Sequence, residues 1–203
     1  ESSLGEFLHA EGLRDRFIIA TKFFWNFEKE KRHPDTSYDY IMRECDASLR
    51  RLKTDRIDLY QIHSWDPLTQ PDEVGAALRE LRHQGKVRWF GVSNQNVDQM
   101  RMYQRHFDVE CLQPPYNLLS RDIEQHELPE CLENRVGVIA YSPLYRGLLT
   151  GKYSANHTFE DTRANNPLFV GTAFKRMLDG LDELRPLAEG YGLSLTQLAL
   201  RWV

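Results

Sequence analysis

Cysteine is scarce in this sequence, and its distribution argues against a disulfide scaffold. The 203 residues contain three cysteines, Cys45, Cys111 and Cys131, which are far apart and form no CxxC motif. An odd number of widely spaced cysteines is typical of free thiols in a reducing compartment. We therefore expect three small core residues and a cytoplasmic protein.

Long apolar runs and blocks of one charge are also missing. No segment approaches the roughly 20 apolar residues of a membrane helix. The 26 basic and 30 acidic residues are interspersed and give a formal net charge of −4. The first residues have neither the basic nor the apolar region of a signal peptide. These absences argue against a membrane or a nucleic acid as partner and leave the oligomeric state open.

Several motifs that would identify the chemistry do not occur. The chain has no GxGxxG or GxxxxGK[ST] phosphate loop, no GxSxG elbow and no HExxH helix. The seven histidines are scattered and never share a helix face at the spacing of metal ligands. We therefore expect no metal site.

The sequence does contain a regular alternation of strands and helices. Five apolar runs have strand length: Phe17–Thr21, Ile57–His63, Val87–Val92, Val109–Gln113 and Gly137–Tyr141. Helices are expected at Ser2–Glu11, Thr36–Arg51, Pro71–Gln84, Asn96–His106, Ile123–Glu133 and Phe174–Glu189, and after the capping box that Ser194 opens. The length suits one domain, residues 1–203. Such alternation favours a parallel sheet with crossover helices, either open or closed into a barrel.

One helix and one loop depart from this pattern. We expect the helix over Phe174–Glu189 to be interrupted at Pro186. The stretch Gly151–Val170 has no periodicity and predicts a long functional loop. Just before it, glycines allow close backbone approach while Arg146 and Lys152 offer positive charge. This segment is either a binding loop for an anion or a turn with two surface cations.

Polar side chains stand at the carboxyl ends of all five strands. They are Lys22, His63, Ser93 with Asn94, Gln113, and Tyr141 with Ser142. Turns need asparagine or serine, but they do not need lysine, histidine or glutamine. In a closed parallel barrel these strand ends meet on the face where active sites lie. The pattern favours a functional His63 over a core histidine, with Asp66 either orienting it or starting a turn.

Segments over the whole chain resemble the aldo-keto reductase family. They occur in the order of the family's motifs and at fitting intervals. They are Ile19–Lys22, Asp58–His63, Gly85–Arg88, Gly91–Asn94, Gln113–Asn117 and Ala140–Leu144. The run Tyr145–Tyr153 is similar to the bacterial branch related to inositol-cluster reductases and, more distantly, to potassium-channel β subunits.

The resemblance implies a fold and a reaction. The fold is an α/β TIM (β/α)8 barrel, of which this chain would supply about strands three to seven. The reaction is NADPH-dependent reduction of an aldehyde or ketone to an alcohol by hydride transfer. Of the family's catalytic Asp, Tyr, Lys and His, the match assigns Lys22 and His63. Lys22 would lower the pKa of the tyrosine, and His63 would hydrogen-bond the small carbonyl substrate.

NADP(H) is the cofactor that the resemblance implies. Ser93, Asn94 and Gln113 would hold the nicotinamide carboxamide, because asparagine and glutamine side chains both donate and accept. Tyr141 would stack on the ring. The pyrophosphate would lie along Ser142, Leu144, Arg146 and Gly147, with added charge from Lys152 and Arg163. An apolar substrate pocket is expected at Phe24, Trp25 and Trp65.

The chain departs from the family pattern at both ends. It begins after the catalytic Asp and Tyr and ends before the eighth strand, so we expect a fragment without reductase activity of its own. Tyr60 and Tyr116 are the nearest tyrosines, and neither matches a family position. Two other interpretations remain: a nucleotide-binding regulatory or interaction module with lost catalysis, and an unrelated TIM-barrel hydrolase that uses His63 and Asp66.

Overall fold

A computed structural model gives the fold and describes residues 1–27 and 32–203. The chain divides into two compact units. The first unit comprises Glu1–Pro114 and Ile123–Ile139, and the second comprises Pro115–Asp122 and Ala140–Val203. No helix in the described ranges is long and apolar enough to cross a membrane.

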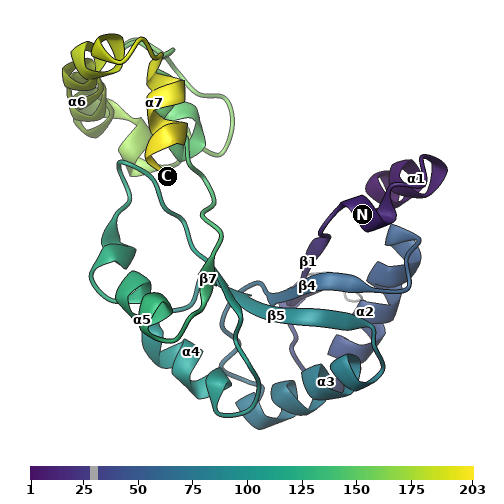
Figure 1. Cartoon of the computed structure of the whole chain (residues 1–203). Coiled ribbons are helices and arrows are strands. Elements are labelled where there is room, and N and C mark those ends of the chain that lie inside the picture. Colours follow the sequence, from purple (N-terminus) through teal and green to yellow (C-terminus); the bar gives the residue numbers. More distant parts are fainter. Residues whose placement is uncertain (28–31) are drawn as a thin grey trace. The chain divides into compact units, whose positions relative to one another are not determined.

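The first unit is built on a five-stranded parallel sheet, shown in Figure 1. Its strand order is β1 (Ala20–Phe23), β4 (Ile57–Ile62), β5 (Val87–Ser93), β6 (Cys111–Gln113) and β7 (Gly137–Val138). A small antiparallel pair, β2 (Trp25–Asn26) and β3 (His33–Pro34), follows β1. Because β1 and β7 are both edges, the sheet is open. The parallel sheet that the sequence predicts is confirmed.

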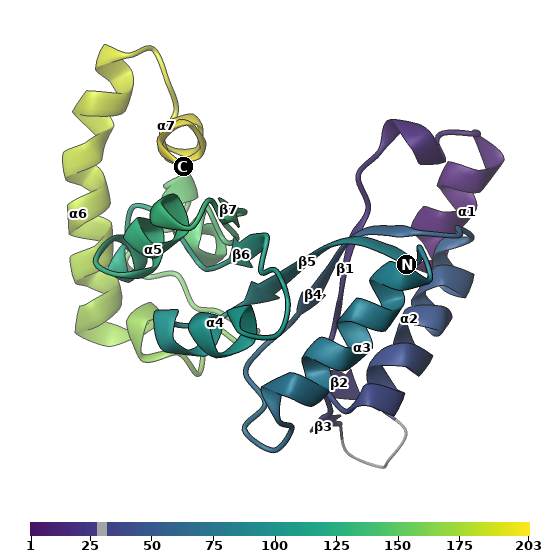
Figure 2. The ribbon, with the colours of Figure 1, turned by 60° about the horizontal axis from the view of Figure 1, so that its bottom comes forward.

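Helices cover one face of this sheet, which we call the outer face. They are α1 (Ser2–Ala10), α2 (Tyr38–Leu52), α3 (Pro71–His83), α4 (Val97–Gln104) and α5 (Glu127–Glu133), with short 3-10 turns at Arg14–Arg16 and Asp122–Glu124. Figure 2 shows α2 and α3 side by side along β4 and β5. Tyr60, Ile62 and Phe90 join the core under these helices. Since side chains alternate along a strand, Leu59 and Gln61 face the opposite, inner face.

The second unit has its own smaller core. It contains the 3-10 segments η3 (Tyr145–Thr150) and η4 (Pro167–Phe169) and the helices α6 (Gly171–Gly190) and α7 (Leu195–Trp202). Its buried residues are Leu148, Leu149, Phe169, Phe174, Leu181 and Ala199. The capping box at Ser194 is confirmed, because Ser194 Oγ accepts from Gln197 N and Gln197 Oε1 accepts from Ser194 N. The irregular stretch Gly151–Val170 is also confirmed, apart from η4.

Several sequence-based expectations about these elements are wrong. The helix predicted for Ile123–Glu133 begins at Glu127, and the strand predicted for Val109–Gln113 begins at Cys111. The first strand is Ala20–Phe23 rather than Phe17–Thr21, because the Asp58 carboxylate binds the Ile19 N–H in place of a strand partner. The last strand ends at Val138 rather than at Tyr141, because prolines 114 and 115 on the neighbouring segment have no N–H for the ladder. Helix α6 continues through Pro186, since this residue is exposed and water can satisfy the carbonyl that loses its donor.

Candidate active site

The register of the sheet brings inner-face residues from all five strands into one row. Lys22 pairs with Gln61, Gln61 with Gly91, Gly91 with Cys111, and Cys111 with Gly137. We call these five residues the lysine row. At the next inner position toward the carboxyl ends of the strands, Ser93 pairs with Gln113, and His63 follows directly after β4. Lys22, His63, Ser93 and Gln113 therefore belong to adjacent rows of one sheet.

The Lys22 ammonium acts electrostatically on His63. Lys22 lies within β1, one position before its end, and is half-buried. Burial lowers the pKa of Lys22, and Cys111 opposes this effect. Burial also lowers the pKa of His63, and the positive charge of Lys22 lowers it further. His63 is therefore neutral at pH 7, and a neutral imidazole can donate one hydrogen bond and accept another.

The segment after β5 joins three strand ends through hydrogen bonds. Ser93 Oγ donates to the Gln113 carbonyl at 2.7 Å. Asn94 has a left-handed backbone with φ 55°, and its Nδ2 donates to the His63 carbonyl at 3.0 Å. Asparagine tolerates this conformation better than most residues. The two amide-bearing residues and the serine that the sequence predicts for a carboxamide are thus brought together with His63.

The second unit contains a loop with an unusual backbone. Ser142, Tyr145, Arg146 and Gly147 have φ values of 56°, 44°, 54° and 90°. Two N–H groups of this loop bond within it: Tyr145 N donates to the Ser142 carbonyl and Gly147 N donates to the Leu144 carbonyl, both at 2.9 Å. Tyr141, Ser142 and Arg146 line a hollow of about 250 Å³ in this unit. Arg146 supplies a charged side chain to this hollow, and the phosphate contacts of Ser142, Leu144, Arg146 and Gly147 stay a prediction.

Asn117 holds this loop in place. Its side chain is 1 % exposed. Asn117 Nδ2 donates to the Ser142 carbonyl at 3.0 Å, and its Oδ1 accepts from Leu119 N at 2.9 Å. The sequence gives Asn117 no role beyond its place in a family motif, and nothing local signals that it reaches Ser142, 25 positions away.

The two further cations predicted to bind the cofactor, Lys152 and Arg163, differ in their surroundings. The Arg163 guanidinium binds the Asp161 carboxylate, the Arg146 carbonyl at 2.9 Å and the Tyr153 hydroxyl at 2.7 Å. The bonds from Arg163 lower the pKa of Asp161 to about 2. Arg163 is thus a clamp within its loop, with its charge already paired. Lys152 is exposed, and its ammonium lies 5.1 Å from the centre of the Tyr153 ring.

The aromatic residues predicted for the substrate pocket lie in different environments. Phe24 is buried, and its ring meets the half-buried Trp25 edge-on at 4.7 Å. The Arg32 guanidinium lies 4.6 Å from the centre of the Trp25 ring. Trp65 packs at 5.3 Å against Tyr103, which belongs to the core of the first unit. Trp65 is therefore tied to the core, whereas Trp25 follows the edge strand that carries Lys22.

Asp66 and Tyr60 have structural surroundings. Asp66 is 1 % exposed and accepts from the Thr36 and Thr69 hydroxyls and from Leu68 N, so it forms a turn and does not orient His63. Tyr60 lies under the helices on the outer face, and burial raises its pKa well above the usual value. Neither residue assists Lys22 or His63, which removes the main support for a hydrolase.

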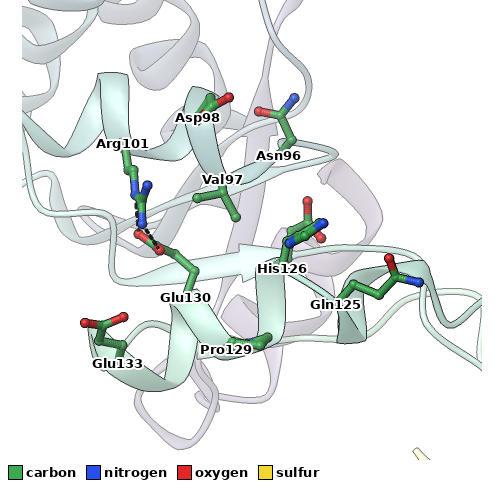
Figure 3. Close-up of a pocket in the computed structure, with 10 residues that line it drawn as sticks. Asn96, Val97, Asp98, Arg101, Gln125, His126, Pro129, Glu130 and Glu133 are labelled. Carbon is green, nitrogen blue, oxygen red and sulfur yellow. Dashed lines mark hydrogen bonds and ion pairs between the residues drawn. The ribbon is translucent and has the colours of Figure 1, made fainter.

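A hollow of about 560 Å³ between α4 and α5 contains none of the predicted site residues (Figure 3). Arg101 points into it and donates to both oxygens of Glu130, at 2.9 and 2.6 Å. Asn134 Nδ2 adds a bond to the same carboxylate at 3.1 Å. This carboxylate is satisfied and joins the two helices. Nor does any group of three or more His, Cys, Asp or Glu in the described ranges have the arrangement of a metal site.

Comparison with known families matches residues 1–203 to the family described as "Aldo/keto reductase family". The chain belongs to the aldo/keto reductase family. Aldo-keto reductase YhdN from Bacillus subtilis is 38 % identical over 206 residues, covering 100 % of this chain and 62 % of that protein. The NADH-specific methylglyoxal reductase from Escherichia coli is 35 % identical over 203 residues, covering 94 % and 62 %.

A solved structure supports the same aldo/keto reductase assignment. The chain superimposes on the glycerol dehydrogenase AKR11B4 from Gluconobacter oxydans with a TM-score of 0.91 and 38 % identity. The match covers 98 % of this chain and 62 % of that one. The α/β barrel class predicted from the sequence is confirmed, and the chain spans about three fifths of the length of these relatives. The finer relation to the inositol-cluster and channel-subunit branch stays a prediction.

Proposed function

We propose that this protein is a nicotinamide-dependent reductase that converts a small aldehyde or ketone to an alcohol, and that residues 1–203 belong to one barrel domain. The observation that carries the proposal is the placement of Lys22, His63, Ser93 and Gln113 in adjacent inner rows at the carboxyl ends of the strands. Active sites of parallel α/β barrels lie at this end. Family membership supports the same reaction class.

The residues present suit a nicotinamide dinucleotide. Ser93, Asn94 and Gln113 lie together, and a bound carboxamide would exchange for the bonds that the Ser93 hydroxyl and Asn94 Nδ2 now make there. The Arg146 side chain on the left-handed loop would offer positive charge to phosphate, and Tyr141 would offer an aromatic face. When bound, such a cofactor supplies the hydride.

Lys22 and His63 would act on the charge that develops during reduction. Reduction of a carbonyl places negative charge on its oxygen, so a neutral His63 would donate a hydrogen bond there and orient the substrate. The Lys22 ammonium would favour loss of a proton from a neighbouring donor, since a cation stabilises the deprotonated form. We propose NADP(H) as the cofactor. The E. coli relative is named as NADH-specific, so both cofactors belong in the test.

The test is reduced-nicotinamide oxidation by the full-length protein with NADPH or NADH and a panel of carbonyl compounds. Methylglyoxal comes first, and glycerol serves for the oxidative direction, because these substrates appear in the names of two relatives. Lys22→Met and His63→Ala should each lower kcat by about 100-fold or more. Lys175→Met, at an exposed position on α6, is the matched control and should retain the rate.

Either of two outcomes would contradict this proposal. Tight nucleotide binding without turnover of any carbonyl would favour a nucleotide-binding module. Equal rates in the wild type and in Lys22→Met would remove the proposed site.

A further inference from the structure

Arg163 is a cation whose hydrogen bonds all lie within the second unit, and the proposed mechanism does not use it. The resemblance to the family predicts that its charge acts on the cofactor. In the structure, Arg163 Nη1 donates to the Arg146 carbonyl at 2.9 Å and to the Tyr153 hydroxyl at 2.7 Å. Its Nε and Nη2 donate to the Asp161 carboxylate at 2.9 and 2.6 Å. These bonds join the irregular stretch Gly151–Val170 to the left-handed loop before it.

The same bonds leave the Arg163 guanidinium little capacity for a further ligand. A guanidinium has five N–H donors and no acceptor. The Arg146 carbonyl and the Tyr153 hydroxyl take both Nη1 hydrogens, and Asp161 takes the Nε hydrogen and one Nη2 hydrogen. Arginine commonly binds phosphate through two parallel N–H groups. With one Nη2 hydrogen left, Arg163 cannot form that paired contact while these bonds last.

Asp161 and Phe159 fix the orientation of the Arg163 side chain. Asp161 Oδ1 also accepts from Arg163 N at 2.9 Å, so one carboxylate binds both the backbone and the guanidinium. The guanidinium carbon lies 4.5 Å from the centre of the Phe159 ring. That ring meets Phe169 edge-on at 5.4 Å, and Phe169 belongs to the core of this unit. Arg163 therefore presents Nη1 in a direction that the core of the unit helps to set.

The carbonyl that Arg163 holds belongs to a strained part of the loop. Arg146 has φ 54° and ψ 28°, a left-handed conformation that is costly for a residue with a side chain and persists where neighbouring groups hold it. Gly147 follows with φ 90°, and a Cβ atom there would lie 3.2 Å from the Tyr153 hydroxyl and 3.6 Å from Arg163 Nη1. Thr150 Oγ1 donates to the Gly147 carbonyl at 2.6 Å. Side chains thus hold both carbonyls of this turn.

Arg146, and not Arg163, is the cation at the predicted phosphate position. The Arg146 side chain lines the hollow of about 250 Å³ together with Tyr141 and Ser142, whereas Arg163 does not line it. Arg163 therefore reaches this hollow through the backbone of Arg146 and not through its own charge.

We propose that Arg163 is a positioning residue for Arg146. Asp161 and Phe159 orient its guanidinium, Nη1 holds the Arg146 carbonyl, and the left-handed turn directs the Arg146 side chain to a phosphate group of the nucleotide. The proposal rests on the proposed function for the nucleotide, while the hold on the turn rests only on bonds within the second unit.

The test is the affinity of full-length Asp161→Asn for NADPH, measured by fluorescence titration. The charges of Arg163 and Arg146 both lower the pKa of Asp161, so removing this carboxylate would strengthen anion binding if charge alone mattered. If Asp161 orients Arg163, the substitution should instead weaken the affinity by roughly fivefold. Asp179→Asn removes the same charge at an exposed position on α6 and is the matched control, with a Kd within about twofold of the wild type.

A double substitution separates positioning from direct contact. Arg163→Lys keeps the charge but loses the forked donors, so the NADPH affinity should fall by roughly five- to tenfold. In an Arg146→Met background the same substitution should change Kd by less than about twofold, because the residue through which Arg163 acts is gone. Unchanged or tighter binding in Asp161→Asn, or equal effects of Arg163→Lys in both backgrounds, would overturn the proposal.

Amide hydrogen exchange at Gly147, followed by NMR without nucleotide, gives a readout that does not depend on binding. Gly147 N donates to the Leu144 carbonyl at 2.9 Å, and releasing the turn would open this bond. Exchange should be about tenfold faster in Asp161→Asn and Arg163→Lys than in the wild type or Asp179→Asn. Unchanged exchange would overturn the hold on the turn. If the wild type binds neither NADPH nor NADH, the proposed function fails, while the exchange rate still decides whether Arg163 holds Arg146.

Discussion

The two units present their candidate site residues in different ways. In the first unit, Lys22, Ser93 and Gln113 lie on strands, and the ladder fixes their spacing. In the second unit, Ser142 and Arg146 lie on a loop with left-handed backbone, held by side chains such as Asn117. The first arrangement depends on backbone register, and the second depends on a few specific hydrogen bonds. The two should therefore respond differently to substitution.

The largest expected contrast is between two glycines. Gly91→Ala places a Cβ 2.7 Å from the Cys111 carbonyl, and backbone at this distance cannot move aside cheaply. We expect a loss of about 2 kcal/mol in the free energy of unfolding, measured by urea denaturation. Gly180 lies inside α6, where a Cβ atom would have nothing within 4 Å, so Gly180→Ala should gain about 0.5–1 kcal/mol. Equal changes in the free energy of unfolding in Gly91→Ala and Gly180→Ala would contradict the expected difference between the two positions.

The next largest effect concerns Asp58 at the start of β4. Its carboxylate is 2 % exposed and binds Ile19 N, Arg14 and Arg88. Burial alone would raise the pKa of Asp58, but these bonds hold it below its usual value of 3.8. We expect Asp58→Asn to lower the free energy of unfolding by about 2 kcal/mol.

The same carboxylate gives a pH dependence with a defined sign. The pKa of Asp58 is lower in the folded state than its usual value of 3.8. Its contribution to the free energy of unfolding is therefore complete above pH 3.8 and is lost as the pH falls through the pKa of the folded state. Denaturation at pH 7 and near pH 3 should show the wild type losing more stability than Asp58→Asn. The same difference in free energy of unfolding between the wild type and Asp58→Asn at both pH values would contradict this account.

In the second unit, the corresponding test is Asn117→Ala. It removes the donor to the Ser142 carbonyl and leaves that oxygen without this bond. We expect about 1 kcal/mol less stability and a roughly five- to tenfold weaker nucleotide affinity, measured by fluorescence titration. Asn165→Ala, at an exposed position of the neighbouring loop, is the control. Equal affinity in the wild type and in Asn117→Ala would show that the loop does not depend on this bond.

The comparison also explains what could be predicted from the sequence. Strand-end residues such as Lys22 and His63 were predictable, because apolar runs and their polar ends are local patterns. The contacts of Arg163 and Asn117 were not, because their partners Arg146 and Ser142 lie 17 and 25 positions away and depend on loop geometry. The ends of β1 and β7 were misjudged for a related reason: the Asp58 carboxylate and the prolines after β6 alter the ladder from neighbouring segments.

The smallest effect is also the most direct test of the central claim, that the strand ends bring Lys22 and His63 into one site. An NMR pH titration of His63 in the wild type should give a midpoint below the usual value of 6.5, because burial and the Lys22 charge both disfavour the imidazolium. In Lys22→Met this midpoint should rise toward 6.5. A wild-type midpoint at or above 6.5, unchanged in Lys22→Met, would contradict the account.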